Sequence, residues 1–177
     1  MFWQTSRFQI DVNRPKVMGI VNVTPDSFSD GGRFNDVALA LAHCEELLAQ
    51  GADILDLGAE STRPGAQALP LEQELQRLMP VLAEAVKLGV PISVDTYKPE
   101  VMQAALDAGA DIINDIWALR YPPQRVGGPS GADVVAAHPT CGVCLMHMHR
   151  DPQSMQAMPM AGNVPPQVVT FLEQRSQ

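Results

Sequence analysis

The sequence has 177 residues, with 12 lysines and arginines against 20 aspartates and glutamates, so its formal net charge is −8. This acidic balance argues against binding to nucleic acid or to an anionic membrane, because both depend on basic side chains that neutralise phosphates. No apolar run approaches the ~18 residues of a membrane-spanning helix, no secretory signal is visible, and three cysteines do not suggest a disulfide framework. We therefore expect a cytoplasmic protein with one domain over residues 1–177 and no second domain.

Five short apolar runs alternate with helical patterns along the chain. Runs of about five aliphatic residues without strict polar alternation are typical of strands buried on both faces of a parallel sheet. The expected strands are Lys16–Val23, Gly51–Leu57, Val90–Val94, Gly109–Asp115 and Gly142–Met148. The expected helices are Val37–Leu48, Leu71–Val86, Pro99–Leu106 and Gln167–Arg175.

Local signals set the expected limits of these helices. Asp36 is a good N-cap for the first helix, and Gly89 and Gly109 end the second and third helices. Pro80, inside the second pattern, predicts a kink or a break there. The proline-rich segment Tyr121–Ser130 is predicted to be a loop.

Strand and helix alternate about five times, which indicates right-handed βαβ units around a parallel sheet, either doubly wound or closed into a barrel. Polar residues fall at the carboxyl ends of the expected strands, where both architectures bind ligands. These residues are Asn22, Asp56, Asp95, Asn114 and Asp115. Each one alone is also explained as a turn or cap residue, but their recurrence at successive strands favours a ligand site.

Two loops carry residue types that bind anions. The first, Asn22–Phe34, is long and rich in small polar residues, which suits an active-site loop or a plain surface loop. The second, Glu60–Gly65, combines hydroxyls with Arg63, whose guanidinium matches a phosphate or a carboxylate, and Arg33 of the first loop adds positive charge. A solvated turn that caps the next helix is the alternative for the second loop.

Asp95 and a cysteine-histidine segment are further candidates for chemistry. The Asp95 carboxylate suits the paired N–H groups of a heterocycle or a developing positive charge, and capping of the following helix is the alternative. Cys141 and Cys144, followed by His147 and His149, invite a zinc site. Because the chain has no second cysteine pair of this kind, buried and inert cysteines are the favoured interpretation.

Several of these segments resemble signatures of the bacterial dihydropteroate synthase family, and the resemblance covers nearly the whole chain. Met18–Gly32 resembles the first signature and Asp56–Gly65 the second, while Ile92–Thr96, Asn114-Asp115 and Leu145–Met148 fit later strands. The resemblance implies a TIM barrel that condenses 7,8-dihydropterin-6-ylmethyl pyrophosphate with p-aminobenzoate. The products are 7,8-dihydropteroate, on the way to folate, and pyrophosphate. Sulfonamides compete for the p-aminobenzoate position in this family.

The resemblance also implies roles for individual residues. Asn22 corresponds to a Mg²⁺ ligand near the pyrophosphate, and Thr62, Arg63 and Pro64 belong to the loop that contacts pyrophosphate and shapes the p-aminobenzoate pocket. The residues implied for the pterin site are Asp56, Asp95, Asn114, Ile116 and Met146. Asp95, Arg63 and Thr62 are the implied catalytic residues, with Asp95 stabilising the pterin cation that remains when pyrophosphate leaves.

The chain departs from the family pattern in three respects, one of which is a Tyr121–Ser130 loop that is longer than usual. His149-Arg150 stands where members commonly have Gln-Gly, and a further pterin aspartate, a bridging lysine and an Arg-x-His pair have no counterpart after His149. Since a barrel of eight βα units needs about 250 residues, we expect about five units and a chain truncated at its C-terminus. The open alternatives are a non-catalytic pterin-binding fragment and a pterin-binding methyltransferase. The resemblance implies a homodimer for full-length members.

Overall fold

A computed structural model describes residues 1–23, 33–60, 68–151, 154–155 and 158–177 of the chain. An N-terminal hairpin precedes an alternation of strands and helices. In chain order, the elements are β1 (Phe2–Gln4), β2 (Gln9–Asp11), β3 (Met18–Asn22), α1 (Arg33–Ala49), β4 (Ile54–Gly58), α2 (Leu71–Ala85), η2 (Val86–Leu88), β5 (Ile92–Asp95), α3 (Pro99–Asp107), β6 (Ile112–Asp115), α4 (Gly131–Ala137), β7 (Gly142–Leu145) and α5 (Val164–Arg175). Among the described residues, no helix is long and apolar enough to cross a membrane.

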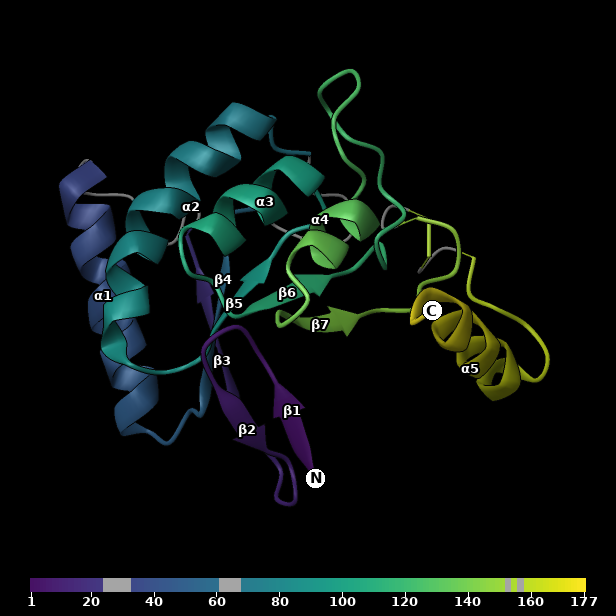
Figure 1. Ribbon diagram of the computed structural model, residues 1–177, viewed down its shortest axis with the longest axis horizontal. Coiled ribbons are helices and arrows are strands. Elements are labelled where there is room, and N and C mark those ends of the chain that lie inside the picture. Colours follow the sequence, from purple (N-terminus) through teal and green to yellow (C-terminus); the bar gives the residue numbers. More distant parts are fainter. Residues whose placement is uncertain (24–32, 61–67, 152–153, 156–157) are drawn as a thin grey trace.

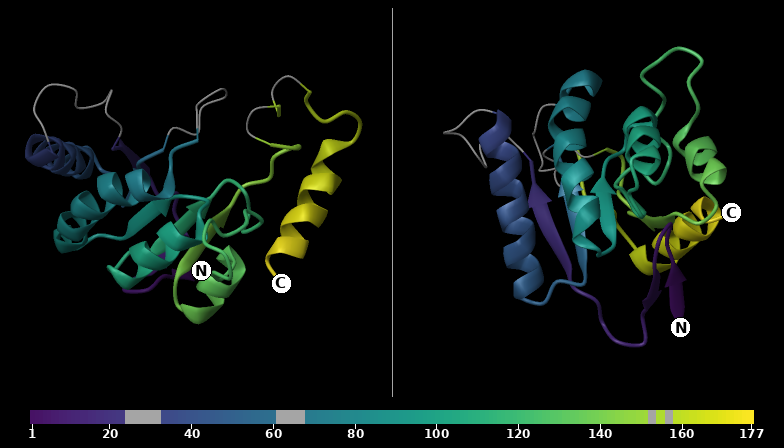
Figure 2. Two further views of the ribbon diagram at one scale, coloured as in Figure 1. Left: turned by 90° about the horizontal axis from the view of Figure 1, so that it is seen from above. Right: turned by 60° about the vertical axis from the view of Figure 1, so that its left-hand side comes forward.

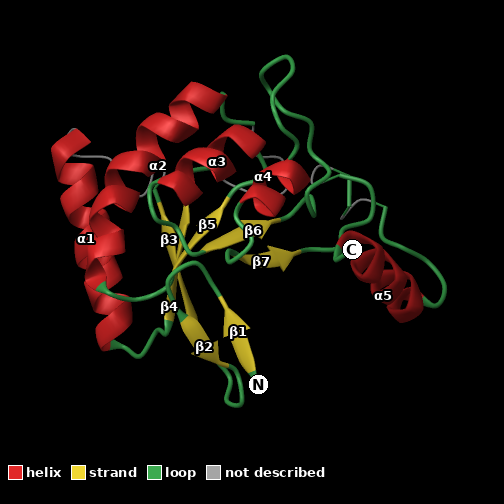
Figure 3. Cartoon of the chain, in the orientation of Figure 1, coloured by secondary structure: helices red, strands yellow, loops and turns green. Residues whose placement is uncertain are grey.

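The main sheet is parallel, and its strands follow chain order as β3-β4-β5-β6-β7. Helices α1 to α4 lie together on one side of these strands, and α5 stands apart at the β7 end (Figure 1, Figure 2, Figure 3). A doubly wound fold reverses its strand order and places helices on both faces of the sheet, whereas a (β/α) barrel adds each strand beside the previous one with the helices outside. The fold is therefore of the TIM-barrel type, with five consecutive parallel strands, and the prediction is confirmed.

The helix-covered face of the sheet forms the main hydrophobic core. Val21, Leu57, Val94 and Ile113 lie in one row across four strands, and all four are fully buried in the same cluster as helix residues such as Leu78. Each such side chain contributes about 1.5–3 kcal/mol through its removal from water. Because side chains alternate along a strand, the residues on either side of this row point to the opposite face.

The hairpin β1–β2, which the sequence did not predict, covers the amino end of that opposite face. Its Ile10 packs with Ile54 and Ile112 in a second cluster. The contact is close, because a Cβ added at Gly142 would lie 3.0 Å from side-chain atoms of Trp3 and Ile112. The hairpin thus occupies the amino ends of the strands and leaves their carboxyl ends to the polar residues.

Several predicted limits of the helices are corrected by the structure. Helix α1 begins at Arg33, so Asp36 lies in its first turn and is not the N-cap. Helix α2 continues through Pro80 without a break. Pro80 has no N–H to donate to the carbonyl oxygen of Gln76, but both residues are exposed, so water solvates that carbonyl. Gly89 does end this segment, in the left-handed conformation with φ 74°.

One helix was not predicted, and the start of another was predicted too late. Helix α4 follows the predicted loop and begins with a capping box, in which Ser130 and Asp133 each accept a hydrogen bond from the other's backbone N–H. Helix α5 begins at Val164, before the predicted Gln167. The prolines in its first turn lack a backbone N–H, but N–H groups in the first turn have no acceptor within the helix, so the helix can start there.

Candidate functional site at the carboxyl end of the sheet

The register of the sheet brings most of the predicted polar residues onto one face. Asn22, Gly58, Asp95, Asn114 and Cys144 are successive partners across all five strands. Asp56 and Ser93 are partners two residues earlier in β4 and β5, so they point to the same side. We call this the inner face: Asn22, Asp56, Ser93, Asp95, Asn114 and Cys144. It is the face opposite the helices, at the carboxyl ends of the strands.

Asp56 and Asn114 are joined directly on the inner face. The Asn114 Nδ2 group donates a hydrogen bond of 3.1 Å to Asp56 Oδ2 across the intervening strand β5. Among the described residues, Asp56 Oδ1, Asp95 Oδ1 and Ser93 Oγ have no hydrogen-bond partner although all three atoms are buried. Since a buried oxygen without a partner costs about 1–3 kcal/mol, these atoms are placed to accept or donate hydrogen bonds to a polar ligand.

The second carboxylate of the inner face, Asp95, is held in an unfavourable environment. Burial, together with the nearby carboxylates, of which Asp56 is the largest contributor, raises the pKa of Asp95 to about 7. Gly58 lies beside this side chain, and a Cβ added there would be at 3.5 Å from Asp95 Oδ2, an ordinary contact distance. The N-cap of α3 is Lys98, so the alternative role of Asp95 as a helix cap is wrong.

The predicted site residues at the ends of β6 and β7 differ in their surroundings. Ile116 and Met146 are half-buried, and the Met146 N–H donates to the backbone oxygen of Asp115 at 3.2 Å, which ties β7 to β6. Asp115 itself is fully buried and accepts hydrogen bonds from the backbone N–H groups of Trp117 and Leu119. The turn interpretation is therefore correct for Asp115, which shapes the chain beside the inner face.

Part of the predicted site lies outside the described residues. Thr62, Arg63 and Pro64 belong to this part, as do residues 24–32 of the first loop and the side chain of Arg33. Asn22 is described: it is exposed at the carboxyl end of β3, in line with Gly58 and Asp95.

The three cysteines differ in their surroundings. Cys44 is buried, as predicted, and burial raises the pKa of its thiol to about 11. Cys141 is half-buried, and Cys144 is exposed on the inner face, so the prediction of buried cysteines is wrong for Cys144. Partial desolvation of its sulfur, together with the nearby carboxylates Asp56 and Asp95, raises the pKa of the Cys144 thiol.

A buried ionic network behind the site is a feature that sequence reasoning missed. Lys98 Nζ hydrogen-bonds to Glu60 Oε2 and Glu74 Oε2, and the three side chains are 2%, 8% and 1% exposed. Tyr97 donates its hydroxyl to Glu60 Oε1 at 2.5 Å, and Thr96 donates to Glu74 Oε1 at 2.6 Å. The partners lie 24 and 38 residues from Lys98 in sequence, so no local sequence pattern indicates the network.

The polar side chains of the inner face suit a metal ion bound partly by water and substrate, and do not suit one held only by protein ligands. No group of three or more His, Cys, Asp or Glu side chains that could hold a metal ion exists within the described part of the chain. A cage made only of protein ligands is thus not formed by these residues. Mg²⁺, however, commonly takes one or two protein oxygens and completes its shell with water and substrate phosphates, and the exposed Asn22 amide oxygen is of this ligand type.

Comparison with known proteins identifies the family. The family described as "Pterin binding enzyme" matches residues 18–177. A dihydropteroate synthase of Neisseria meningitidis serogroup B is 48% identical over 176 residues, which are 98% of this chain and 59% of the relative. The crystal structure of Yersinia pestis dihydropteroate synthase with a sulfonamide drug complex matches with a TM-score of 0.85 and 40% identity, over 99% of this chain and 61% of that one.

A third comparison is with Burkholderia cenocepacia dihydropteroate synthase complexed with 7,8-dihydropteroate, at a TM-score of 0.83 and 45% identity, over 99% of this chain and 57% of that one. The chain thus spans about three-fifths of the length of the relatives that it matches. With a parallel sheet of barrel type and a polar inner face, the chain belongs to the pterin-binding enzyme family, and within that family it is similar to the dihydropteroate synthases compared above.

Proposed function

We propose that this chain binds the pterin substrate of dihydropteroate synthesis and takes part in its condensation with p-aminobenzoate. The substrate is 7,8-dihydropterin-6-ylmethyl pyrophosphate, and the products are 7,8-dihydropteroate and pyrophosphate. The observation that carries the proposal is the joined pair Asp56 and Asn114 beside Asp95, with buried carboxylate oxygens that lack partners among the described residues. The crystallised Burkholderia relative holds 7,8-dihydropteroate, which contains both halves of this condensation.

The pterin ring is bound by the polar atoms of the inner face. Its amino and ring N–H groups donate to the unpartnered oxygens of Asp56 and Asp95, and Asn114 keeps Asp56 oriented by its 3.1 Å hydrogen bond. Ile116 and Met146, both half-buried, form apolar walls for the ring. Because a ligand that donates N–H groups favours the ionised carboxylate, its binding lowers the pKa of Asp95 from about 7 and releases a proton.

Departure of pyrophosphate leaves positive charge on the pterin methylene, and this charge is opposed by the Asp95 carboxylate through electrostatics, without proton transfer. Arg63 and Thr62 contact the departing pyrophosphate, and Pro64 helps to shape the p-aminobenzoate pocket. Asn22 would hold Mg²⁺, which would supply neutralisation of charge on the phosphate oxygens. The amine of p-aminobenzoate then attacks the methylene carbon and loses a proton.

A second candidate is pterin binding without turnover. The observation that favours it is the length of the match, since the chain covers 59% of the Neisseria relative. The pterin-binding methyltransferase is disfavoured by the Thr62-Arg63 loop, because a methyl donor brings no pyrophosphate for it to bind.

Turnover by the purified chain separates the two candidates. The chain is prepared from a host that lacks its own dihydropteroate synthase and is incubated with the pterin pyrophosphate, p-aminobenzoate and Mg²⁺. The proposal predicts 7,8-dihydropteroate and an equal amount of pyrophosphate, and Asp95→Asn reduces both. Saturable pterin binding with no product supports binding without turnover, and absence of both rejects the proposal.

A further inference from the structure

The end of β5 is tied to two other elements through Thr96, the residue directly after Asp95. The Thr96 hydroxyl donates a hydrogen bond of 2.6 Å to Glu74 Oε1, in the first turn of α2. The Thr96 N–H group donates to the carbonyl oxygen of Asn114, at the end of β6, at 3.1 Å. Since Asp95 and Asn114 are partners in the sheet, Thr96 connects this pair of site residues to a helix on the other face.

The acceptor on α2 is itself held in place. Glu74 is buried, and its second oxygen accepts a hydrogen bond from the buried ammonium group of Lys98. The backbone N–H of Lys98 donates to Thr96 Oγ1 at 3.3 Å, so the hydroxyl accepts one hydrogen bond and donates another. Burial raises the pKa of Glu74, and the bonds from Lys98 and Thr96 act against this rise. Because bonds to a buried carboxylate are among the stronger hydrogen bonds, α2 fixes the position of the Thr96 side chain.

The position of the Asp95 carboxylate depends on the backbone that Thr96 holds. Asp95 Oδ1 is buried and has no hydrogen-bond partner among the described residues, so no bond within that part of the chain orients this oxygen. The pairing of β5 with β6 ends at Asp95 and Asn114, and the Thr96 N–H extends it by one bond. Asn114 in turn orients Asp56, so a shift at the end of β5 or β6 changes the spacing of all three side chains.

We infer that Thr96 is a positioning residue for the pterin site: through its bonds to Glu74 and to the Asn114 backbone, it holds Asp95 and Asn114 at a fixed spacing for one pterin ring. The inference rests on the proposed function for the identity of the ligand. The restraint itself follows from the contacts of Thr96 alone.

The test removes the Thr96 hydroxyl and keeps the backbone bond. Thr96→Val removes the hydroxyl with little change of shape, and Thr96→Ser keeps the hydroxyl and loses one methyl group. Thr5→Val is the matched control, because Thr5 is also a buried threonine, and its hydroxyl donates to the Phe8 carbonyl oxygen at 3.0 Å. Thr5 lies at the amino end of the sheet, where its Cγ2 atom is 3.1 Å from a Cβ added at Gly142, the first residue of β7.

Three quantities are measured for each variant at a temperature at which it is folded. They are the urea midpoint of unfolding, the protection of amide 96 from hydrogen exchange, and the dissociation constant for 6-hydroxymethylpterin from a fluorescence titration. If Thr96→Val does not fold, Thr96→Ala takes its place, because it removes the same bond without placing a methyl group beside the Glu74 carboxylate.

We expect both valine variants to unfold at lower urea, since each leaves a buried polar group without its partner. Only Thr96→Val should lower the protection of amide 96 and raise the dissociation constant, by about tenfold, as for other groups that orient a binding residue. Thr96→Ser should bind within about threefold of the wild type, because its hydroxyl still reaches Glu74.

Three results would overturn the inference. Unchanged pterin affinity in Thr96→Val shows that the hydroxyl does not position the site, and equal losses in Thr96→Val and Thr5→Val show an effect of stability alone. A loss in Thr96→Ser as large as that in Thr96→Val assigns the effect to the methyl group. If the wild type does not bind pterin, the proposed function fails, and the protection of amide 96 alone decides the restraint by Thr96.

Discussion

Replacement of Asp95 by asparagine should stabilise the chain and make its stability less dependent on pH. Each pKa unit corresponds to about 1.4 kcal/mol, so a rise from 3.8 to about 7 makes the ionised carboxylate unfavourable in the folded state by about 4 kcal/mol. The folded state binds a proton that the unfolded state has already released between these two values. The contribution of Asp95 to the free energy of unfolding therefore falls as pH rises from about 4 to about 7 and then levels off.

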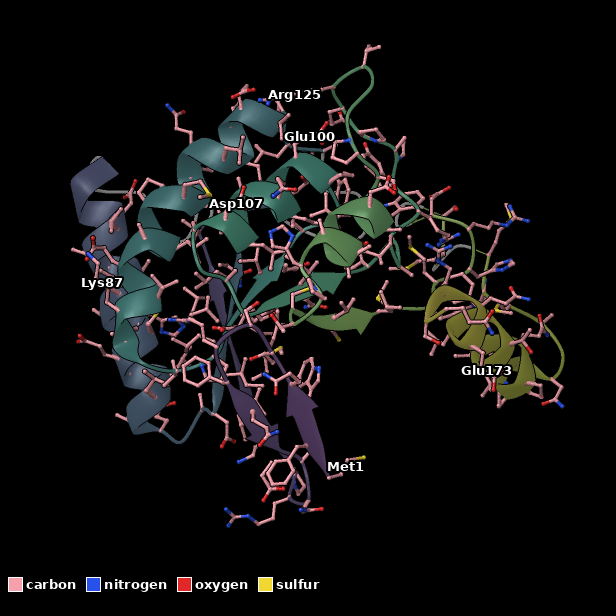
Figure 4. All side chains as sticks on the ribbon, viewed as in Figure 1. Met1, Lys87, Glu100, Asp107, Arg125 and Glu173 are labelled. Atoms are coloured by element: carbon pink, nitrogen blue, oxygen red, sulfur yellow. The ribbon has the colours of Figure 1, made fainter. Side chains whose placement is uncertain are left out.

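Urea unfolding at a series of pH values measures this effect. We expect Asp95→Asn to exceed the wild type by about 3–4 kcal/mol at about pH 8 and by little at about pH 4, while pterin binding weakens. Asp107→Asn is the control, because Asp107 is exposed on α3 (Figure 4) and its pKa is lowered, chiefly by a hydrogen bond from Gln103. Equal pH dependence in the wild type and Asp95→Asn would refute the reasoning.

Three further substitutions test separate parts of the structure. Arg7→Met removes the side-chain donors to the fully buried Asp111 and should lower the free energy of unfolding in urea by about 2 kcal/mol; no change would mean that the hairpin is not anchored there. Arg150→Gly should raise the same quantity by about 1 kcal/mol, because Arg150 is exposed with φ 68°, and a loss would contradict this. Asn114→Ala should weaken pterin binding about tenfold in a fluorescence titration, since Asp56 loses its orienting bond; unchanged affinity would remove Asn114 from the site.

The sequence predicted the inner face because topology alone brings its residues together. Parallel strands place their carboxyl ends at one edge, so polar residues after successive apolar runs meet even when the register is unknown. Asn22, Asp56, Asp95 and Asn114 follow this rule. Arg150 adopts a positive φ, which glycine takes without strain, so the backbone at this position suits the glycine that the resemblance implies there.

Other parts gave no local signal. The strands of the hairpin have three residues each, too few to show a period. Ala118 and Leu119 adopt positive φ without being glycine, held by Asp115 and by Arg175 of α5, which donates to the Ala118 carbonyl oxygen at 2.8 Å. The bonds of Lys98 join residues far apart in sequence. In each case, tertiary contacts decide the local conformation.

Pterin binding by the inner face is tested most directly by a fluorescence titration of the chain with 6-hydroxymethylpterin. Asp56→Asn replaces a buried carboxylate oxygen by an N–H donor beside Asn114, so the ligand's N–H groups lose their acceptor. We predict saturable binding at one site in the wild type, affinity about a hundredfold weaker in Asp56→Asn, and wild-type affinity in Asp107→Asn. Equal affinity in Asp56→Asn and the wild type would contradict pterin binding at this face.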